Sequence, residues 1–204
     1  MNLFVFKYLE IENYSDLVNE LKSQIDLEGI KQSKYKFTLL DVPKILSKCK
    51  LLSNYLNNQG LHPVKIAVLK FLPWDSGICH IHVDNCNAKT HDELKMNYVN
   101  NNQITRDLLA LQIGLENVEN SYTVLYKYLE GEIIQQNVIN SNRPLINFPS
   151  LNFKNAKMQE IDRYVADRPV LFNVTVPHTV INPTDFIRLL LTIRFDPDPW
   201  HLTH

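Results

Sequence analysis

The segment from Cys79 to Asp84, which reads CHIHVD, holds residue types well suited to binding a metal ion. If this segment is a strand, alternate side chains share a face, so His82 and Asp84 point the same way, about 7 Å apart along the backbone. One imidazole and one carboxylate at that separation can bind a single metal ion. His80 has the same parity and is the rival first ligand. A further ligand has to come from elsewhere in the chain.

A second segment, from Arg168 to Asn182, places His178 at the mouth of a strongly apolar strand. Arg188 follows ten residues after this histidine, on the next expected strand. Two imidazoles and one carboxylate form the facial triad that leaves the remaining positions open on Fe(II). A guanidinium on the strand after His178 is suited to hold a carboxylate of a co-substrate through two parallel hydrogen bonds. The two segments together predict a metal site with an anion site beside it.

The HxD pair, the distal histidine and the arginine ten residues on resemble the 2-oxoglutarate- and Fe(II)-dependent oxygenase superfamily. Its small members, common in phages and marine bacteria, have core blocks similar to VKIAVLKFLP, HIHVDN, ALQIGLENVENSYTVLYKY, RPVLFNVTVPHTVIN and RLLLTIRF. The resemblance runs from about residue 62 to about residue 195 and does not extend to residues 1–60. It implies a double-stranded β-helix, a relative of the jelly roll.

The resemblance also implies roles for individual residues. His82, Asp84 and His178 would be the Fe(II) ligands of the catalytic centre. Arg188 would bind the C5 carboxylate of 2-oxoglutarate, and Arg194, which has the same strand parity, is the alternative anchor. In the family's reaction 2-oxoglutarate and O2 are co-substrates, and succinate and CO2 form as a C–H bond of the primary substrate is hydroxylated.

Three tyrosines and one asparagine are further candidates for contact with the co-substrate. Tyr122, Tyr126 and Tyr128 lie on one face of an expected strand, although an aromatic stripe at this period is also typical of a core. Asn173 faces the same side as Thr175 and is either a co-substrate ligand or a buried amide bound to the backbone. We include Tyr122, Tyr126 and Asn173 in the predicted cofactor site.

The elements that must position these residues are mostly strands, because the hydrophobic period changes from helical to alternating after residue 60. Strands are expected over six segments: 62–72, 78–84, 108–115, 122–129, 169–176 and 186–195. Residues 130–165 are expected to be irregular with a short helix near 156–164, and Asn85–Arg106 to be a long loop, either a substrate lid or an insertion. The absence of crossover helices from this pattern favours an antiparallel barrel or jelly roll.

Residues 1–60 read as a mostly helical region that packs on this core. Ser15 is a candidate N-cap for one helix, and Asp41, with Pro43 in the first turn, begins a second helix that ends near Gly60. A chain of 204 residues is long enough for one core. We therefore expect a single domain over 1–204, mainly β with N-terminal helices, whose oxygenase core spans 61–196.

Composition argues against several classes of protein. The 21 Lys and Arg residues balance 22 Asp and Glu residues, and the net charge of -1 disfavours a nucleic acid partner. No segment approaches the ~20 apolar residues of a membrane span, and the first residues lack the pattern of a secretory signal. Cys49, Cys79 and Cys86 form no CxxC pair. We therefore expect free thiols in a cytoplasmic protein, located in the host cytoplasm if a phage encodes it.

The leading hypothesis is an Fe(II)- and 2-oxoglutarate-dependent hydroxylase whose primary substrate the sequence does not identify. The first alternative is a jelly-roll binding or structural module that has lost turnover. The second is a cupin-type metal enzyme that uses His80, His82 and His178 and does not bind 2-oxoglutarate.

Overall fold

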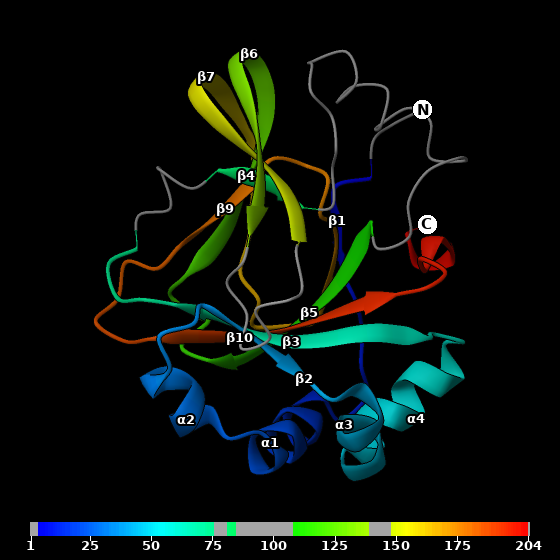
Figure 1. Ribbon diagram of the computed structural model, residues 1–204. Coiled ribbons are helices and arrows are strands. Elements are labelled where there is room, and N and C mark those ends of the chain that lie inside the picture. The colour runs from blue at the N-terminus through cyan, green and yellow to red at the C-terminus, as the bar shows by residue number, and fades with distance from the viewer. Residues whose placement is uncertain (1–3, 76–80, 85–107, 139–147, 204) are drawn as a thin grey trace.

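The computed structural model describes residues 4–75, 81–84, 108–138 and 148–203. In this part of the chain two antiparallel sheets face each other, and α-helices cover the outer side of the larger sheet (Figure 1). The prediction of a mainly β chain with N-terminal helices is confirmed at this level. The expected loop over Asn85–Arg106, His80, Cys79 and Cys86 lie outside the described residues.

The larger sheet has six strands in the spatial order β1-β8-β5-β10-β3-β2. Their bounds are Phe6–Tyr8 for β1, Phe37–Leu40 for β2, Pro63–Phe71 for β3, Leu109–Glu116 for β5, Val170–Asn173 for β8 and Arg188–Phe195 for β10. The smaller sheet closes on itself in the order β4-β7-β6-β9. Its strands are His82–Asp84 for β4, Tyr122–Val138 for β6, Phe148–Tyr164 for β7 and His178–Ile181 for β9.

The helices present apolar side chains to the larger sheet. They are α1 (Tyr14–Gln24), α2 (Leu27–Gln32), α3 (Val42–Lys48) and α4 (Lys50–Asn58), and a short 3-10 helix follows over Trp200–Leu202. Leu21 of α1 and Leu52 of α4 are fully buried in the core formed with the sheet. Burying a leucine side chain contributes roughly 1.5–3 kcal/mol. This packing fixes the sheet that carries the predicted anion-binding arginine.

Of the two predicted helix N-caps, Asp41 is confirmed and Ser15 is not. Asp41 is the N-cap of α3, and its Oδ1 accepts a hydrogen bond from Lys44 N at 2.9 Å. The expected single helix after Asp41 is instead two helices that meet at Cys49, whose φ and ψ are not helical. Asn13, in the left-handed region, takes the N-cap position of α1 in place of Ser15.

The first 60 residues also contribute two strands that the sequence analysis did not predict. β1 pairs with β8 and β2 pairs with β3, so both lie at the edges of the larger sheet. A strand this short has too few alternating positions to be recognised, and its pairing partners are distant in sequence.

No helix of the described ranges is long and apolar enough to cross a membrane.

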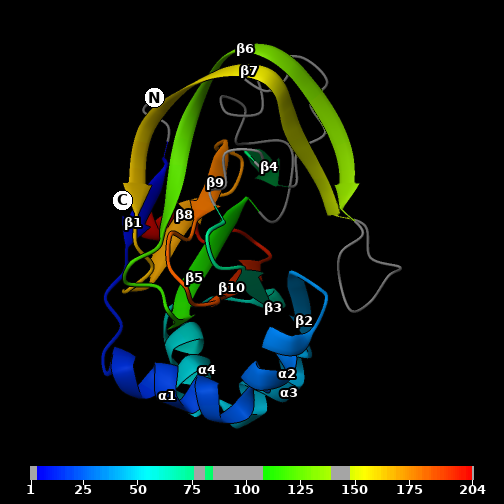
Figure 2. The same cartoon turned by 90° about the vertical axis from the view of Figure 1, so that its left-hand side faces the viewer.

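The prediction of an irregular segment is wrong for residues 130–138 and 148–164, because they belong to β6 and β7, which pair as a long two-stranded ribbon. The expected helix near 156–164 is part of β7. Three register shifts interrupt the pairing of β6, and Gly131 has a φ of 132°. A Cβ at Gly131 would lie 2.6 Å from the Ala156 Cα, so only glycine allows the strands to approach here. The ribbon arches over β4 and β9 (Figure 2).

Strand alternation divides the side chains of β10 between two faces. Leu189, Leu191 and Ile193 belong to the core shared with the helices. Arg188 and Arg194 have the opposite parity and therefore point toward the smaller sheet. The inner face of the larger sheet thus carries both arginines that the sequence analysis singled out.

Candidate metal centre

Three of the predicted residues converge between the sheets. His82 and Asp84 lie on β4, and His178 begins β9; ligand atoms of these residues all lie within 4.8 Å of one another. His82 and His178 are paired across the two strands, and their ring centroids are 4.4 Å apart. The His82 Nε2 lies 3.5 Å from the Asp84 Oδ1. The register of a short strand pair therefore assembles a His–Asp–His group suited to a divalent metal, and binding of the metal stays a prediction.

The environment of His178 prepares it to act as a ligand. The residue is 5% exposed, and its Nδ1 lies 2.8 Å from the Val176 carbonyl oxygen. A carbonyl oxygen can only accept, so Nδ1 carries the hydrogen and Nε2 keeps its lone pair. Burial, aided by His82 and opposed by Asp84, lowers the pKa of His178 to about 4. The ring is therefore neutral near pH 7, which is the form that binds a metal.

Asp84 is held in its charged form by its neighbours. Burial raises the pKa of this carboxyl, but His82 and Arg194 outweigh that effect and the net pKa lies below the ordinary value. The Arg194 Nη2 lies 2.7 Å from the Asp84 Oδ2. This ion pair joins β10 of the larger sheet to β4 of the smaller one. Sequence reasoning assigned Arg194 only as the alternative anchor and did not foresee this contact.

Arg188 is the most unusual buried side chain on the inner face. It is fully buried, and its Nε, Nη1 and Nη2 have no hydrogen-bond partner among the described residues. Its guanidinium lies 5.4 Å from the centre of the Phe71 ring. Burial lowers the pKa of Arg188 to about 10, which still leaves it charged at neutral pH. A buried guanidinium with unused donors is costly unless an anion binds it.

Tyr164, at the end of β7 in the smaller sheet, adds a buried polar group that sequence reasoning missed. Its hydroxyl donates to the Gln112 Oε1 at 2.8 Å, and the side chain is buried. Burial raises the pKa of Tyr164, while the charges of Arg188 and Arg194 act in the opposite direction. The hydroxyl therefore stays protonated near both guanidinium groups. Sequence reasoning missed Tyr164 because it expected a helix near 156–164, whereas this segment is part of β7.

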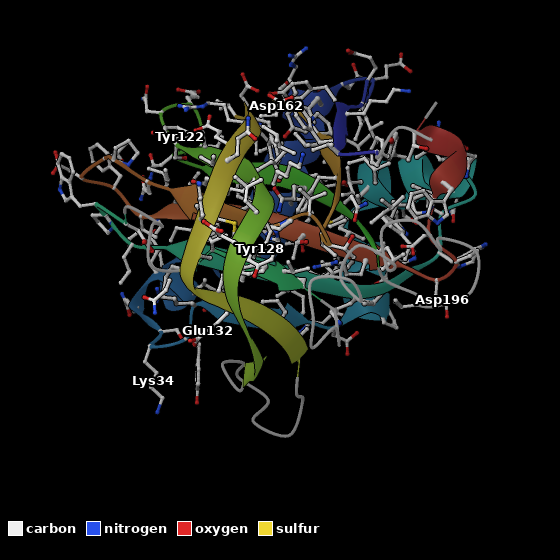
Figure 3. The ribbon with its side chains drawn as sticks, turned by 90° about the horizontal axis from the view of Figure 1, so that it is seen from above. Lys34, Tyr122, Tyr128, Glu132, Asp162 and Asp196 are labelled. Carbon is white, nitrogen blue, oxygen red and sulfur yellow. The ribbon has the colours of Figure 1, made fainter. Side chains whose placement is uncertain are left out.

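The predicted tyrosines lie on the ribbon. The Arg163 guanidinium lies 5.0 Å from the centre of the Tyr122 ring, and the Arg163 side chain is about half exposed. The pKa of Tyr126 is raised by burial and by Glu160. Tyr122 and Tyr128 are labelled along the ribbon in Figure 3. Contact of Tyr122 or Tyr126 with a co-substrate stays a prediction.

Asn173 follows the second of the two interpretations given for it. Its Oδ1 accepts hydrogen bonds from the backbone N and the Oγ1 of Thr175, at 3.0 and 2.7 Å. Its Nδ2 donates to the Phe4 carbonyl oxygen at 3.2 Å. The amide oxygen thus shapes the chain between β8 and β9, and the amide nitrogen holds the segment before β1. Any contact of Asn173 with 2-oxoglutarate stays a prediction.

Among known proteins, only solved structures show a similarity to this chain. No family model and no curated protein matches it. It is similar to the non-heme alpha ketoglutarate dependent carbocyclase SnoK from nogalamycin biosynthesis, at 14% identity and a TM-score of 0.45, over 91% of this chain and 75% of that one. It is also similar to a Pseudomonas putida prolyl-4-hydroxylase, at 12% identity and a TM-score of 0.43, over 96% and 94% of the two chains.

A third similar structure is AviO1 from Streptomyces viridochromogenes Tue57. The identity is 12% and the TM-score 0.48, over 97% of this chain and 91% of AviO1. At these values the function has to be argued from the residues of the chain itself.

Proposed function

We propose that this chain is an Fe(II)- and 2-oxoglutarate-dependent oxygenase that hydroxylates a C–H bond of its substrate. One combination carries the proposal: a His–Asp–His group on the smaller sheet and, on the facing side of the larger sheet, a buried arginine without a partner among the described residues. A metal site alone does not need a second buried cation. A co-substrate that chelates the metal at one end and carries a carboxylate at the other needs both.

The residues present fit such a metal and co-substrate. Two imidazoles and one carboxylate suit Fe(II) and leave positions open for other ligands. When bound, Fe(II) supplies the activation of O2, with 2-oxoglutarate converted to succinate and CO2. Arg188 binds the C5 carboxylate through charge-assisted hydrogen bonds, which satisfies its unused donors. We keep Tyr122 and Tyr126 as candidates for further contacts.

The surroundings of His178 keep this ligand buried and fix its orientation. Phe172 packs against the His178 ring, with centroids 5.2 Å apart, and Leu125 is fully buried beside it in the inner core. The His82 and Asp84 side chains are each 32% exposed, so among the described residues only the His178 side of the site is closed to water. Val176 fixes the tautomer of His178 through its carbonyl oxygen.

We extend the proposal to the architecture and setting. The two sheets form a double-stranded β-helix, in which residues 61–196 are the oxygenase core and residues 1–60 its helical cover within one domain. The small phage and marine bacterial type and the cytoplasmic location are part of the same proposal. The balanced charge of the chain disfavours a nucleic acid as the primary substrate.

The decisive experiment is an anaerobic calorimetric titration with Mn(II), followed by 2-oxoglutarate. We expect the wild type to bind the metal and then the co-substrate, and to form succinate when Fe(II) and O2 are supplied. Asp84→Ala should lose most of the metal affinity, because it removes the charged ligand. Equal Mn(II) affinity in Asp84→Ala and the wild type contradicts the ligand assignment.

Two further outcomes separate the alternatives. Wild-type protein that holds metal but ignores millimolar 2-oxoglutarate would favour a cupin-type enzyme, and protein that binds neither would favour a binding module. His80→Ala should retain the metal and His82→Ala should lose it, because only His82 stands two residues before Asp84. The reverse result would assign the first ligand to His80.

A further inference from the structure

The two oxygen atoms of the Asp84 carboxylate have different neighbours. The Oδ2 lies 2.7 Å from the Arg194 Nη2, whose side chain is 9% exposed. The Oδ1 lies on the side of the histidines, 3.5 Å from the His82 Nε2. The arginine thus occupies one oxygen and leaves the other directed toward the proposed ligand set.

This asymmetry bears on how a metal would be bound. A carboxylate can bind a metal ion through one oxygen or through both, and binding through both takes an additional coordination position. We propose that Arg194 is a positioning residue that restricts Asp84 to binding metal through Oδ1 and so keeps open a position for the co-substrate. The inference rests on the proposed function, because it assigns Arg194 a role in that same site.

The strand geometry explains why Arg194 can reach Asp84. Arg194 of β10 is paired with Ala110 of β5, and directly opposed residues share one face of a sheet. Ala110 is fully buried and has the smallest side chain that carries a Cβ, so it leaves room above the sheet. The long arginine side chain crosses from the larger sheet to β4 through this space. A bulkier residue opposite Arg194 would compete for the path.

A comparison within β10 separates this role from that of an anion anchor. Arg188 and Arg194 share a face and lie six residues apart. The donors of Arg188 are unused among the described residues, whereas Arg194 is engaged with Asp84. The residue with unused donors is the better site for an incoming carboxylate. The engaged residue is the one placed to orient the metal ligand.

The test uses Arg194→Leu and Arg194→Lys, with Lys70→Met as the matched control. Lys70 is also a buried cation, but it lies on the helix side of the larger sheet, where it contacts the carbonyl oxygens of Lys31 and Ser33. The readouts are Mn(II) affinity by calorimetry and the visible absorption of the Co(II)-loaded protein. That absorption reports the number and arrangement of the ligands and does not require turnover.

We expect Arg194→Leu to weaken Mn(II) binding about 10–100-fold, the usual effect of removing a group that orients a metal ligand. We also expect a changed Co(II) spectrum at full loading, because both oxygens of Asp84 become free to bind. Arg194→Lys should recover part of both, and Lys70→Met should change neither. Thermal unfolding of each metal-free variant shows whether it is folded. If Arg194→Leu does not fold, the same measurements are made on Arg194→Lys.

Three results overturn the inference. If Arg194→Leu keeps wild-type Mn(II) affinity, Co(II) spectrum and 2-oxoglutarate affinity, the ion pair is only structural. If it keeps the first two and loses 2-oxoglutarate affinity, Arg194 is an anchor of the co-substrate. If the wild type binds no metal, the proposed function fails as well, and this result is distinct from the first two.

Discussion

Lys70 and Arg188 are buried cations on neighbouring strands of one sheet, yet their surroundings differ. Lys70 pairs across the ladder with Leu189, the residue next to Arg188, and faces the helices. Its Nζ contacts the carbonyl oxygens of Lys31 and Ser33, near the end of α2. Arg188 faces the smaller sheet and has no hydrogen-bond partner in the described part of the chain. Figure 1 shows these two sides of the sheet.

The comparison shows that burial of a charge does not by itself mark a functional site. A cation near the last carbonyl groups of a helix stabilises the helix end, which is a complete role for Lys70. Arg188 is buried without such compensation, because its guanidinium lies over the Phe71 ring and its nitrogens have no acceptor among the described residues. Unused donors, and not burial, distinguish the ligand-binding cation from the structural one.

The largest expected effect comes from Arg188→Leu. Breaking a buried charge pair with a ligand costs roughly 3–5 kcal/mol, so 2-oxoglutarate affinity should fall at least 10²-fold. Stability of the ligand-free protein should stay level or rise, because the variant removes an uncompensated buried charge. Calorimetry and urea denaturation measure the two effects. A variant that unfolds more readily and still binds 2-oxoglutarate would make Arg188 structural, like Lys70.

Sequence reasoning selected three residues that the structure brings together, His82, Asp84 and His178, and their role as metal ligands stays a prediction. His82 and Asp84 could be paired because strand alternation is a local rule, and His178 and Arg188 followed from the apolar strands that carry them. Arg194 was noticed by its parity with Arg188. Its partner could not be predicted, because the contact joins two sheets and residues 110 positions apart.

The wrong prediction that covers the most residues, the irregular segment in place of the ribbon of β6 and β7, also has a physical explanation. Polar and apolar residues alternate imperfectly along 148–164, and three register shifts interrupt the pairing of β6. An irregular twisted ribbon therefore leaves no clear period of two, and a short segment of β7 can be read as a helix. Only pairing with β6 decides the conformation, and that pairing is not visible in a local window. Tyr164 was missed for this reason.

The next effect concerns stabilisation by the co-substrate. A ligand present at 100 times its dissociation constant raises the free energy of unfolding by about 2.7 kcal/mol. Manganese-loaded wild type and Lys70→Met should both gain this amount with 2-oxoglutarate, and Arg188→Leu should gain nothing at the same concentration. Denaturant unfolding with and without 2-oxoglutarate measures the gain. Equal gains in all three proteins would remove the distinction between the two cations.

Lys70→Met should act on stability alone. The substitution keeps the apolar stem but leaves the carbonyl oxygens of Lys31 and Ser33 without their cation, which costs about 1–3 kcal/mol. We expect the midpoint of urea unfolding to fall while the affinity for 2-oxoglutarate stays at the wild-type value. A loss of co-substrate affinity in this variant would mean that the helix side of the sheet controls the site.

The smallest effect is the coupling between the two positions. Lys70 and Arg188 point to opposite faces and share no hydrogen-bond partner among the described residues, so their effects on stability should add to within about 0.5 kcal/mol. The double variant Lys70→Met with Arg188→Leu, completed by both single variants, measures this coupling through urea denaturation. Positions so near in the ladder could still interact through a shift of β3 or β10. Near-additivity therefore shows that the backbone between them is rigid, and a coupling well above 0.5 kcal/mol would mean that the structural cation and the anion-binding cation depend on the same backbone placement.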